Sequence, residues 1–157
     1  MASQVRSNRV SVSAVVEEVE HEVAADALAG GFGLAVAPAP RGVYIEADPQ
    51  VLAAAVTNLV LNAFKHSRTH GHVSVTTIAT ADHVIIDVED ECGGLQPGEA
   101  EDLLRSLDGN RIDRPHPGFG LAIGRRCVEA MGGRVRVRDL PGKGCVFSVA
   151  LPRQTPY

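Results

Sequence analysis

Residues 48–66, DPQVLAAAVTNLVLNAFKH, carry the pattern that decides the fold of this chain. Asp48 is expected to cap a helix whose first residue is Pro49, because the missing N–H of proline costs nothing at that position. Apolar residues recur at helical spacing and predict one buried stripe, formed by Val51, Leu52, Ala55, Val56, Leu59, Val60 and Ala63. The stretch therefore predicts a long amphipathic helix that ends at about His66.

Polar residues form a second line on this helix, beside the apolar stripe: Asn58, Asn62, Lys65 and His66. A rotation of about 100° per residue places all four on one side of the helix. A solvated helix edge is enough to explain such a line taken alone. The alternative is a binding site, since an amide oxygen is a hard ligand that suits Mg²⁺ and a lysine suits phosphate.

Two further helices and several strands are predicted around this helix. One helix is expected from Ser13, as its N-cap, to Leu28, and another from about Gly120 to Met131, each ended by a glycine pair. Extended segments are expected at residues 34–37, 43–47, 73–79, 84–89, 134–139 and 145–151. Because the last four form two hairpins, we predict an α+β fold: a two-layer α/β sandwich with a mixed, mostly antiparallel sheet and about three helices on one face.

The composition is that of one globular domain spanning residues 1–157, with its core at about 10–152. A net charge of -4, aromatic residues at 4% and the lack of tryptophan argue against a nucleic-acid partner. No run of eighteen apolar residues predicts a membrane span, and no signal peptide is recognised. The 3 cysteines are odd in number, which suits free thiols in the cytoplasm, where we expect the domain to work.

The stretch DVEDECGGLQ, residues 87–96, gathers carboxylates at a strand end and then turns into glycine. An Asx-turn is the ordinary explanation of Asp90 in such a place. The functional alternative is a buried carboxylate that accepts a hydrogen bond from an exocyclic amine, while Gly93 and Gly94 let a flat ring approach the backbone. Asp87, Glu89 and Glu91 are expected to be strand-face or solvated charges.

A second glycine pair, Gly118 and Gly120, brackets the entry to the last predicted helix. Free N–H groups at a helix N-terminus bind phosphate oxygens, although a single GxG before a helix is often a packing feature only. The turn around Lys143, between Gly142 and Gly144, is explained by turn chemistry.

Taken in order, four stretches resemble the N, G1, G2 and G3 boxes of the catalytic domain of sensor histidine kinases: NLVLNAFKHS, DECGGL, GFGLAIGRRCVEAMGG and GKGCVFSVALP. The resemblance covers about residues 48–152. It implies a Bergerat ATP-binding fold of the superfamily that includes DNA gyrase, Hsp90 and MutL. It also implies an ATP lid at about residues 95–117, which contains the predicted helical piece from Glu99 to Leu107.

The resemblance assigns roles to individual residues. Asn62 is the implied ligand of the Mg²⁺ that bridges the ATP phosphates, Lys65 reaches those phosphates, and both are the implied catalytic residues. Asp90 is implied to accept from the adenine amino group. The other implied nucleotide-binding residues are Asn58, His66, Gly94, Gly118, Gly120, Leu121 and, behind the aspartate, Cys145.

The resemblance also implies a partner, because no phosphoacceptor hairpin is found in the sequence. The expected partner is a histidine-bearing dimerisation domain, in the same or another chain, and through it a response regulator. The domain itself is expected to be monomeric, without direct membrane contact, and the sequence leaves open whether a parent protein is membrane-anchored.

Three alternatives stay open from the sequence. Hydrolysing ATPases of the superfamily and anti-sigma-factor serine kinases favour glutamate where this chain has Asn58. The segment 95–117 also lacks the phenylalanine usual in the family and offers only leucines, Leu103, Leu104 and Leu107. That departure keeps a degenerate docking or nucleotide-sensing module among the alternatives.

Overall fold

The protein is seen here as a computed structural model that describes residues 8–66, 71–90, 125–140 and 144–154. Its elements are β1 (Asn8–Ser11), α1 (Val12–Gly30), β2 (Gly33–Val36), β3 (Tyr44–Ala47), α2 (Pro49–His66), β4 (His72–Ala79), β5 (His83–Asp90), β6 (Arg134–Leu140) and β7 (Gly144–Gln154). A third helical segment occupies residues 125–130. None of the described helices combines the length and apolarity that crossing a bilayer requires.

The strands form one seven-stranded sheet in the order β1-β3-β7-β5-β4-β2, with β6 also paired to β7. Strand β2 runs parallel to β4, and every other described pair is antiparallel. Both β3 and β6 pair with β7, β3 near its C-terminal end and β6 along the rest. The mixed, mostly antiparallel sheet predicted from the sequence is confirmed.

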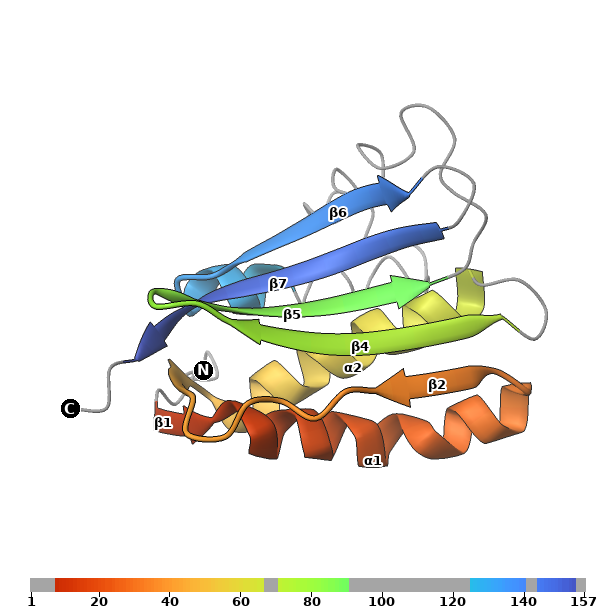
Figure 1. Ribbon diagram of the computed structural model, residues 1–157, viewed down its shortest axis with the longest axis horizontal. Helices are drawn as coiled ribbons and strands as arrows, with labels where there is room; N and C mark the ends of the chain where they lie inside the picture. Colours follow the sequence, from red (N-terminus) through yellow and green to blue (C-terminus); the bar gives the residue numbers. More distant parts are fainter. Residues whose placement is uncertain (1–7, 67–70, 91–124, 141–143, 155–157) are drawn as a thin grey trace, which may run out of the picture.

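The helices α1 and α2 cover one face of the sheet, so the molecule has two layers (Figure 1). Alternation along β5 explains which side chains meet the helices, because successive residues of a strand point to opposite faces. Val84, Ile86 and Val88 are fully buried, whereas Ile85 and Asp87 are only partly covered. The apolar stripe of α2 is buried as expected, apart from the half-buried Val51.

Helix α1 begins two residues earlier than predicted, and its N-cap is Ser11, not Ser13. The Ser11 hydroxyl accepts from the backbone N–H of Ala14 at 3.5 Å. Ser11 is also the last residue of β1, a strand that sequence reasoning missed, and it pairs with Tyr44 of β3. The pairing of β1 with β3 is non-local and ends immediately before α1. The prediction of Ser13 as the N-cap used only the local capping preference of serine and was therefore wrong.

The predicted stop of the third helix at the glycine pair is confirmed. Gly132 has φ 82, and the N–H of Gly133 donates to the carbonyl of Val128 at 2.9 Å. Gly133 then passes so close to β7 that a Cβ there would lie 2.5 Å from the carbonyl oxygen of Ala150. The turn from this helix into β6 therefore has no room for a side chain. The predicted start at Gly120, the piece from Glu99 to Leu107 and the proposed lid at 95–117 lie outside the described residues.

Candidate functional site

Helix α2 is anchored at its N-terminus as the sequence predicted. The Asp48 carboxylate accepts from the backbone N–H groups of Gln50, at 3.1 Å, and Val51, at 3.3 Å. These two bonds satisfy N–H groups that have no partner within the helix. The cap and the buried apolar stripe together hold α2 against β5 and α1.

Near the other end of α2, Asn62 is buried with a 4% exposed side chain. Within the described part of the chain neither its Oδ1 nor its Nδ2 has a hydrogen-bond partner. A buried amide without a partner is costly, by about 1–3 kcal/mol, so an interaction from outside the described residues is expected. The sequence placed Asn62 on a polar edge, and the structure turns it inward beside the apolar stripe.

The end of β5 places a carboxylate inside the molecule. Asp90 is 1% exposed and lies on the same face of the strand as Val84, Ile86 and Val88. Cys145, the residue directly opposite on β7, donates its backbone N–H to Asp90 Oδ1 at 3.3 Å. The Cys145 thiol also lies 3.3 Å from Oδ1 and 3.2 Å from Oδ2. The buried carboxylate is thus held from one side by β7.

The neighbouring carboxylates of β5, which were predicted to be strand-face or solvated charges, face the other side of the sheet. Glu89 is exposed, and Asp87 accepts a hydrogen bond from the hydroxyl of Ser148 at 2.5 Å. Alternation along the strand therefore separates one carboxylate, Asp90, from the surface charges around it. Glu91 lies outside the described residues.

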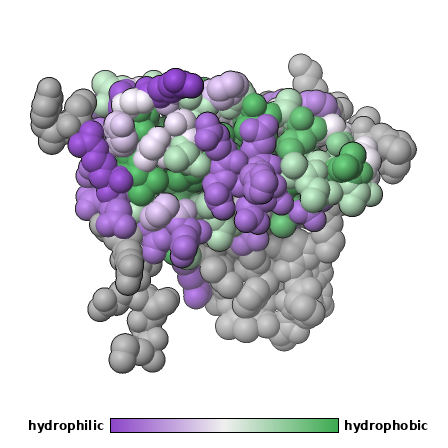
Figure 2. All heavy atoms as spheres, turned by 90° about the horizontal axis from the view of Figure 1, so that it is seen from below, coloured by the Kyte–Doolittle hydropathy of each residue, from purple (hydrophilic) through white to green (hydrophobic). Residues whose placement is uncertain are grey.

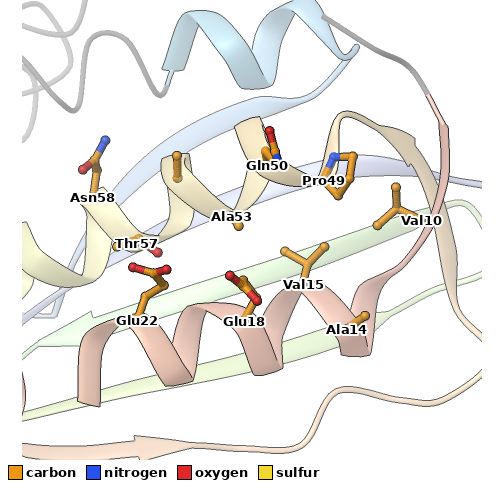
Figure 3. A pocket seen from close by; sticks show the side chains of 11 residues that line it. Val10, Ala14, Val15, Glu18, Glu22, Pro49, Gln50, Ala53, Thr57 and Asn58 are labelled. Carbon is orange, nitrogen blue, oxygen red and sulfur yellow. The ribbon is translucent and has the colours of Figure 1, made fainter. Parts of the chain in front are cut away.

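Asn58 lies one turn before Asn62 but is only half-buried. It lines a pocket of about 630 Å³ between α1 and α2. Figure 3 shows the Asn58 side chain on the edge of α2 that points away from α1. Sequence reasoning missed this pocket, because its two walls come from helices whose relative placement no local pattern encodes. Asn58 therefore stands between the α1–α2 pocket on one side and the buried amide of Asn62 further along the helix.

The C-terminal end of α2 is fixed by an aromatic contact. The rings of Phe32 and Phe64 are stacked with centroids 5.1 Å apart and an interplanar angle of 11°. This contact holds the turn that contains Lys65 and His66, whose side chains lie outside the described part. The other predicted nucleotide-binding residues, Gly94, Gly118, Gly120 and Leu121, also lie outside the described residues.

Asp90 is a buried carboxylate, and Asn62, on an adjacent element, is a buried amide without a partner among the described residues. Together they can bind a polar molecule that donates a hydrogen bond and carries a hard cation with it. Figure 1 shows the C-terminal half of α2 behind the C-terminal end of β5, and α2 and β5 are in contact. Asn62 and Asp90 thus lie toward the same end of the two-layer core. An amide oxygen with no hydrogen-bond partner among the described residues fits a Mg²⁺ ligand.

Comparisons with known proteins agree with this arrangement. The family described as "Histidine kinase-, DNA gyrase B-, and HSP90-like ATPase" matches residues 47–155. The sensor histidine kinase ZraS of Salmonella typhimurium is 35% identical over 109 residues, which cover 69% of this chain and 23% of that protein. The sensor protein KdpD of Escherichia coli is 30% identical over 113 residues, 71% of this chain and 13% of that protein. The chain thus spans about a quarter or less of these relatives.

Solved structures give the same picture. The catalytic domain of histidine kinase ThkA superposes with a TM-score of 0.80 at 18% identity, covering 93% of this chain and 95% of that one, and shows the shared fold. Full-length ShkA in complex with AMPPNP superposes with a TM-score of 0.78 at 28% identity, covering 99% of this chain and 33% of that one.

Proposed function

We propose that this chain binds Mg-ATP and donates the γ-phosphoryl group to a histidine on a separate dimerisation and phosphoacceptor domain. The chain belongs to the family of histidine kinase-, DNA gyrase B- and HSP90-like ATPases. The likeness to sensor histidine kinases and to their catalytic domains supports this choice of acceptor within the family. Residues 1–157 then form one catalytic and ATP-binding domain, acting in the cytoplasm as part of two-component signalling.

The observation that carries the proposal is the buried carboxylate of Asp90, held in place by Cys145. A buried carboxylate accepts from an exocyclic amine, which adenine has, and repels the carbonyl oxygen that guanine presents at the same place. The similarity to ShkA, which was solved with AMPPNP, supports an adenine nucleotide in the corresponding place of this chain.

Asn62 is the residue that we assign to Mg²⁺, because its buried amide lacks a partner within the described residues. When bound, the ion neutralises charge on the ATP phosphates, which is a main requirement of phosphoryl transfer. Lys65, in the last turn of α2, is assigned to the same phosphates, with Asn58 and His66 nearby. Gly94, Gly118, Gly120 and Leu121 complete the proposed nucleotide site on the segments outside the described residues.

The remaining role of the chain is to present the phosphoryl group in line to its acceptor. The relatives are several times longer than this chain, which supports a partner domain. Beyond that domain, we propose a response regulator as the next acceptor. The catalytic domain on its own is proposed to be a monomer that binds nucleotide but transfers nothing until the acceptor is added. No nucleic-acid partner is proposed.

Calorimetric titration with ATP and with GTP, each with and without Mg²⁺, tests the proposal. We expect ATP to bind and GTP to bind at least tenfold more weakly. We also expect Mg²⁺ to tighten the binding of ATP. A folded sample that binds neither nucleotide contradicts the proposal. Equal binding of the two nucleotides contradicts the role of Asp90, and ATP binding that Mg²⁺ does not change contradicts the role of Asn62.

A further inference from the structure

The pocket between α1 and α2 has an apolar floor. Val10 of β1, Val15 of α1 and Ala53 of α2 are buried and line it, together with the small exposed side chains of Ala14 and Ala54 (Figure 3). Small residues on two adjacent helices leave a depression that a third helix can approach closely. The pocket is open along the outer side of the two helices, and its volume of about 630 Å³ suits side chains of a docked segment.

The rim of the pocket on the α1 side is acidic. Glu18 and Glu22 are exposed, one turn apart, and both carboxylates point toward α2 (Figure 3). Helix α1 carries five acidic residues and neither lysine nor arginine: Glu17, Glu18, Glu20, Glu22 and Asp26. The α2 side of the pocket contributes only neutral polar groups, those of Gln50, Thr57 and Asn58. Within the described residues no cation balances this rim.

The surrounding surface is mixed in character. Figure 2 shows the face of the molecule seen from below, where α1 lies in Figure 1, with hydrophilic residues gathered in the middle and hydrophobic ones beside them. A partner of this face must therefore combine apolar side chains with charges of the opposite sign. An amphipathic helix with lysine or arginine beside its apolar stripe has this combination.

We propose that the pocket between α1 and α2 is the docking surface for the helix that carries the phosphoacceptor histidine, and that this helix presents basic residues to Glu18 and Glu22. The inference rests on the proposed function and names the surface that the acceptor uses. It commits to a basic amphipathic helix of the partner domain as the occupant.

The position of Asn58 connects the pocket to the proposed nucleotide site. Asn58 forms one end of the pocket and lies four residues before Asn62, about 6 Å along the helix axis. A helix seated in the pocket therefore passes within one turn of the residue assigned to the metal. Phosphoryl transfer needs the acceptor atom about 3–3.5 Å from the reacting group, so the acceptor must dock on a surface that adjoins the site.

Charge and apolar contact have separate tasks in this interface. Exposed carboxylates on a rim contribute little affinity each, but they set orientation and the rate of encounter, and salt screens them. The buried floor of Val10, Val15 and Ala53 supplies the contact area. The docking is thus expected to weaken with ionic strength without being abolished.

The test uses the purified dimerisation hairpin of the Salmonella typhimurium relative ZraS as the acceptor, because that kinase is 35% identical to this chain. The variant pair Glu18→Lys/Glu22→Lys reverses the rim. The matched control, Glu17→Lys/Glu20→Lys, makes the same change of net charge on exposed residues of the same helix that do not line the pocket. For each protein, ATP affinity, phosphotransfer rate and the amide shifts caused by the hairpin are measured.

We expect the rim reversal to lower kcat/KM for the hairpin at least tenfold and to reverse its dependence on salt, because salt then screens a repulsion, with ATP affinity unchanged. The control pair should lower kcat/KM for the hairpin less than threefold. Hairpin-induced amide shifts should centre on residues 10–22 and 50–58. Ala54→Trp, which fills the pocket from an exposed position without any change of charge, should lower kcat/KM at least tenfold as well, but should leave its dependence on salt in place.

Several results would overturn the docking proposal. If both lysine pairs lose the same amount of kcat/KM, the loss is an effect of net charge and not of the pocket rim. If the rim reversal loses no kcat/KM, Glu18 and Glu22 take no part in docking. Amide shifts confined to the open face of the sheet, where Arg134, Arg136 and Arg138 are exposed, would place the acceptor elsewhere. A hairpin that causes no shifts at millimolar concentration, in a sample that binds ATP, also overturns it. A sample that binds no ATP contradicts the proposed function instead.

Discussion

Cys145 lies directly opposite Asp90 in the β5–β7 pair, and its Sγ is 3.2 Å from one carboxylate oxygen and 3.3 Å from the other. The contact joins strands that are far apart in sequence and fixes the carboxylate inside the core. The backbone N–H of Cys145 adds a second donor at 3.3 Å. The candidate nucleotide site is therefore supported from behind by Cys145 of the last described strand.

Asp90→Asn replaces a charged acceptor by a neutral amide at nearly constant volume. ATP affinity should fall by roughly 1.5–3 kcal/mol, the range for hydrogen bonds to charged groups. Asp87→Asn is the matched control, because Asp87 lies on the same strand with its side chain on the other face of the sheet. Calorimetry on both variants decides the matter, and an Asp90→Asn protein that binds ATP as tightly as the parent would show that adenine lies elsewhere.

Two substitutions of Cys145 separate its packing from its hydrogen bonding. Cys145→Ser keeps a side-chain donor toward Asp90, whereas Cys145→Val keeps the bulk and loses the donor. We expect Cys145→Val to weaken ATP binding by about 0.5–1.5 kcal/mol, and Cys145→Ser to bind ATP about as tightly as the parent. Both variants retain the backbone donor, so a large loss in both would point to packing rather than to the thiol.

Asn62→Leu should change stability and function in opposite directions. Removing two buried polar atoms that lack partners among the described residues should raise the free energy of unfolding by about 1–3 kcal/mol. The same change should abolish the tightening of ATP binding by Mg²⁺. Urea denaturation of the nucleotide-free protein and titration with and without Mg²⁺ give the two readouts.

A destabilised Asn62→Leu protein would show that the amide is already satisfied, and it would remove the main support for Asn62 as the metal residue. Asn58→Leu serves as the comparison, since Asn58 is half-buried and one turn away. Its effect on the free energy of unfolding should stay within about 0.5 kcal/mol, as for surface substitutions.

Gly133→Ala tests the close approach of the third helix to β7. The added Cβ would meet the carbonyl oxygen of Ala150 at 2.5 Å and the side chain of Leu151 at 2.6 Å. We expect a loss of about 3 kcal/mol in the free energy of unfolding, at the upper end of overpacking effects. Gly42→Ala is the control for backbone strain alone, because Gly42 has φ +74 and nothing within 4 Å of the Cβ position.

The free energy of unfolding of the Gly42→Ala variant should fall by about 1 kcal/mol, the cost of a left-handed conformation for an L-residue. Urea titrations of both proteins measure the difference. If Gly133→Ala loses no more stability than Gly42→Ala, the neighbouring strand yields to the added Cβ, and lack of space does not account for the glycine at 133.

Local rules were sufficient for some elements. Asp48 and Pro49 specify the start of α2 through a side-chain bond and a fixed φ, so their roles were predicted correctly. The glycine pair after the third helix was recognised for the same reason. Asp87 and Glu89 were predicted to be strand-face or solvated charges, and the alternation along β5 places them away from the core.

Tertiary contacts decided what the sequence left open. The short strand β1 exists because it pairs with β3, and that pairing moved the cap of α1 from Ser13 to Ser11. The burial of Asn62 depends on how α2 meets the sheet, which a helical wheel does not contain. The pocket near Asn58 needs both helices in place before it exists.

Strand β7 has a consequence for how this domain is made. It pairs with β3, β5 and β6, and a hydrogen bond from Gln154 to Glu46 spans 108 positions of sequence. On the ribosome, β3, β5 and β6 emerge before β7, so the edges that they pair with β7 wait unpaired. The sheet closes only after residues up to 154 have left the exit tunnel, which makes a late, cooperative step of folding and gives chaperones a time window in which to act.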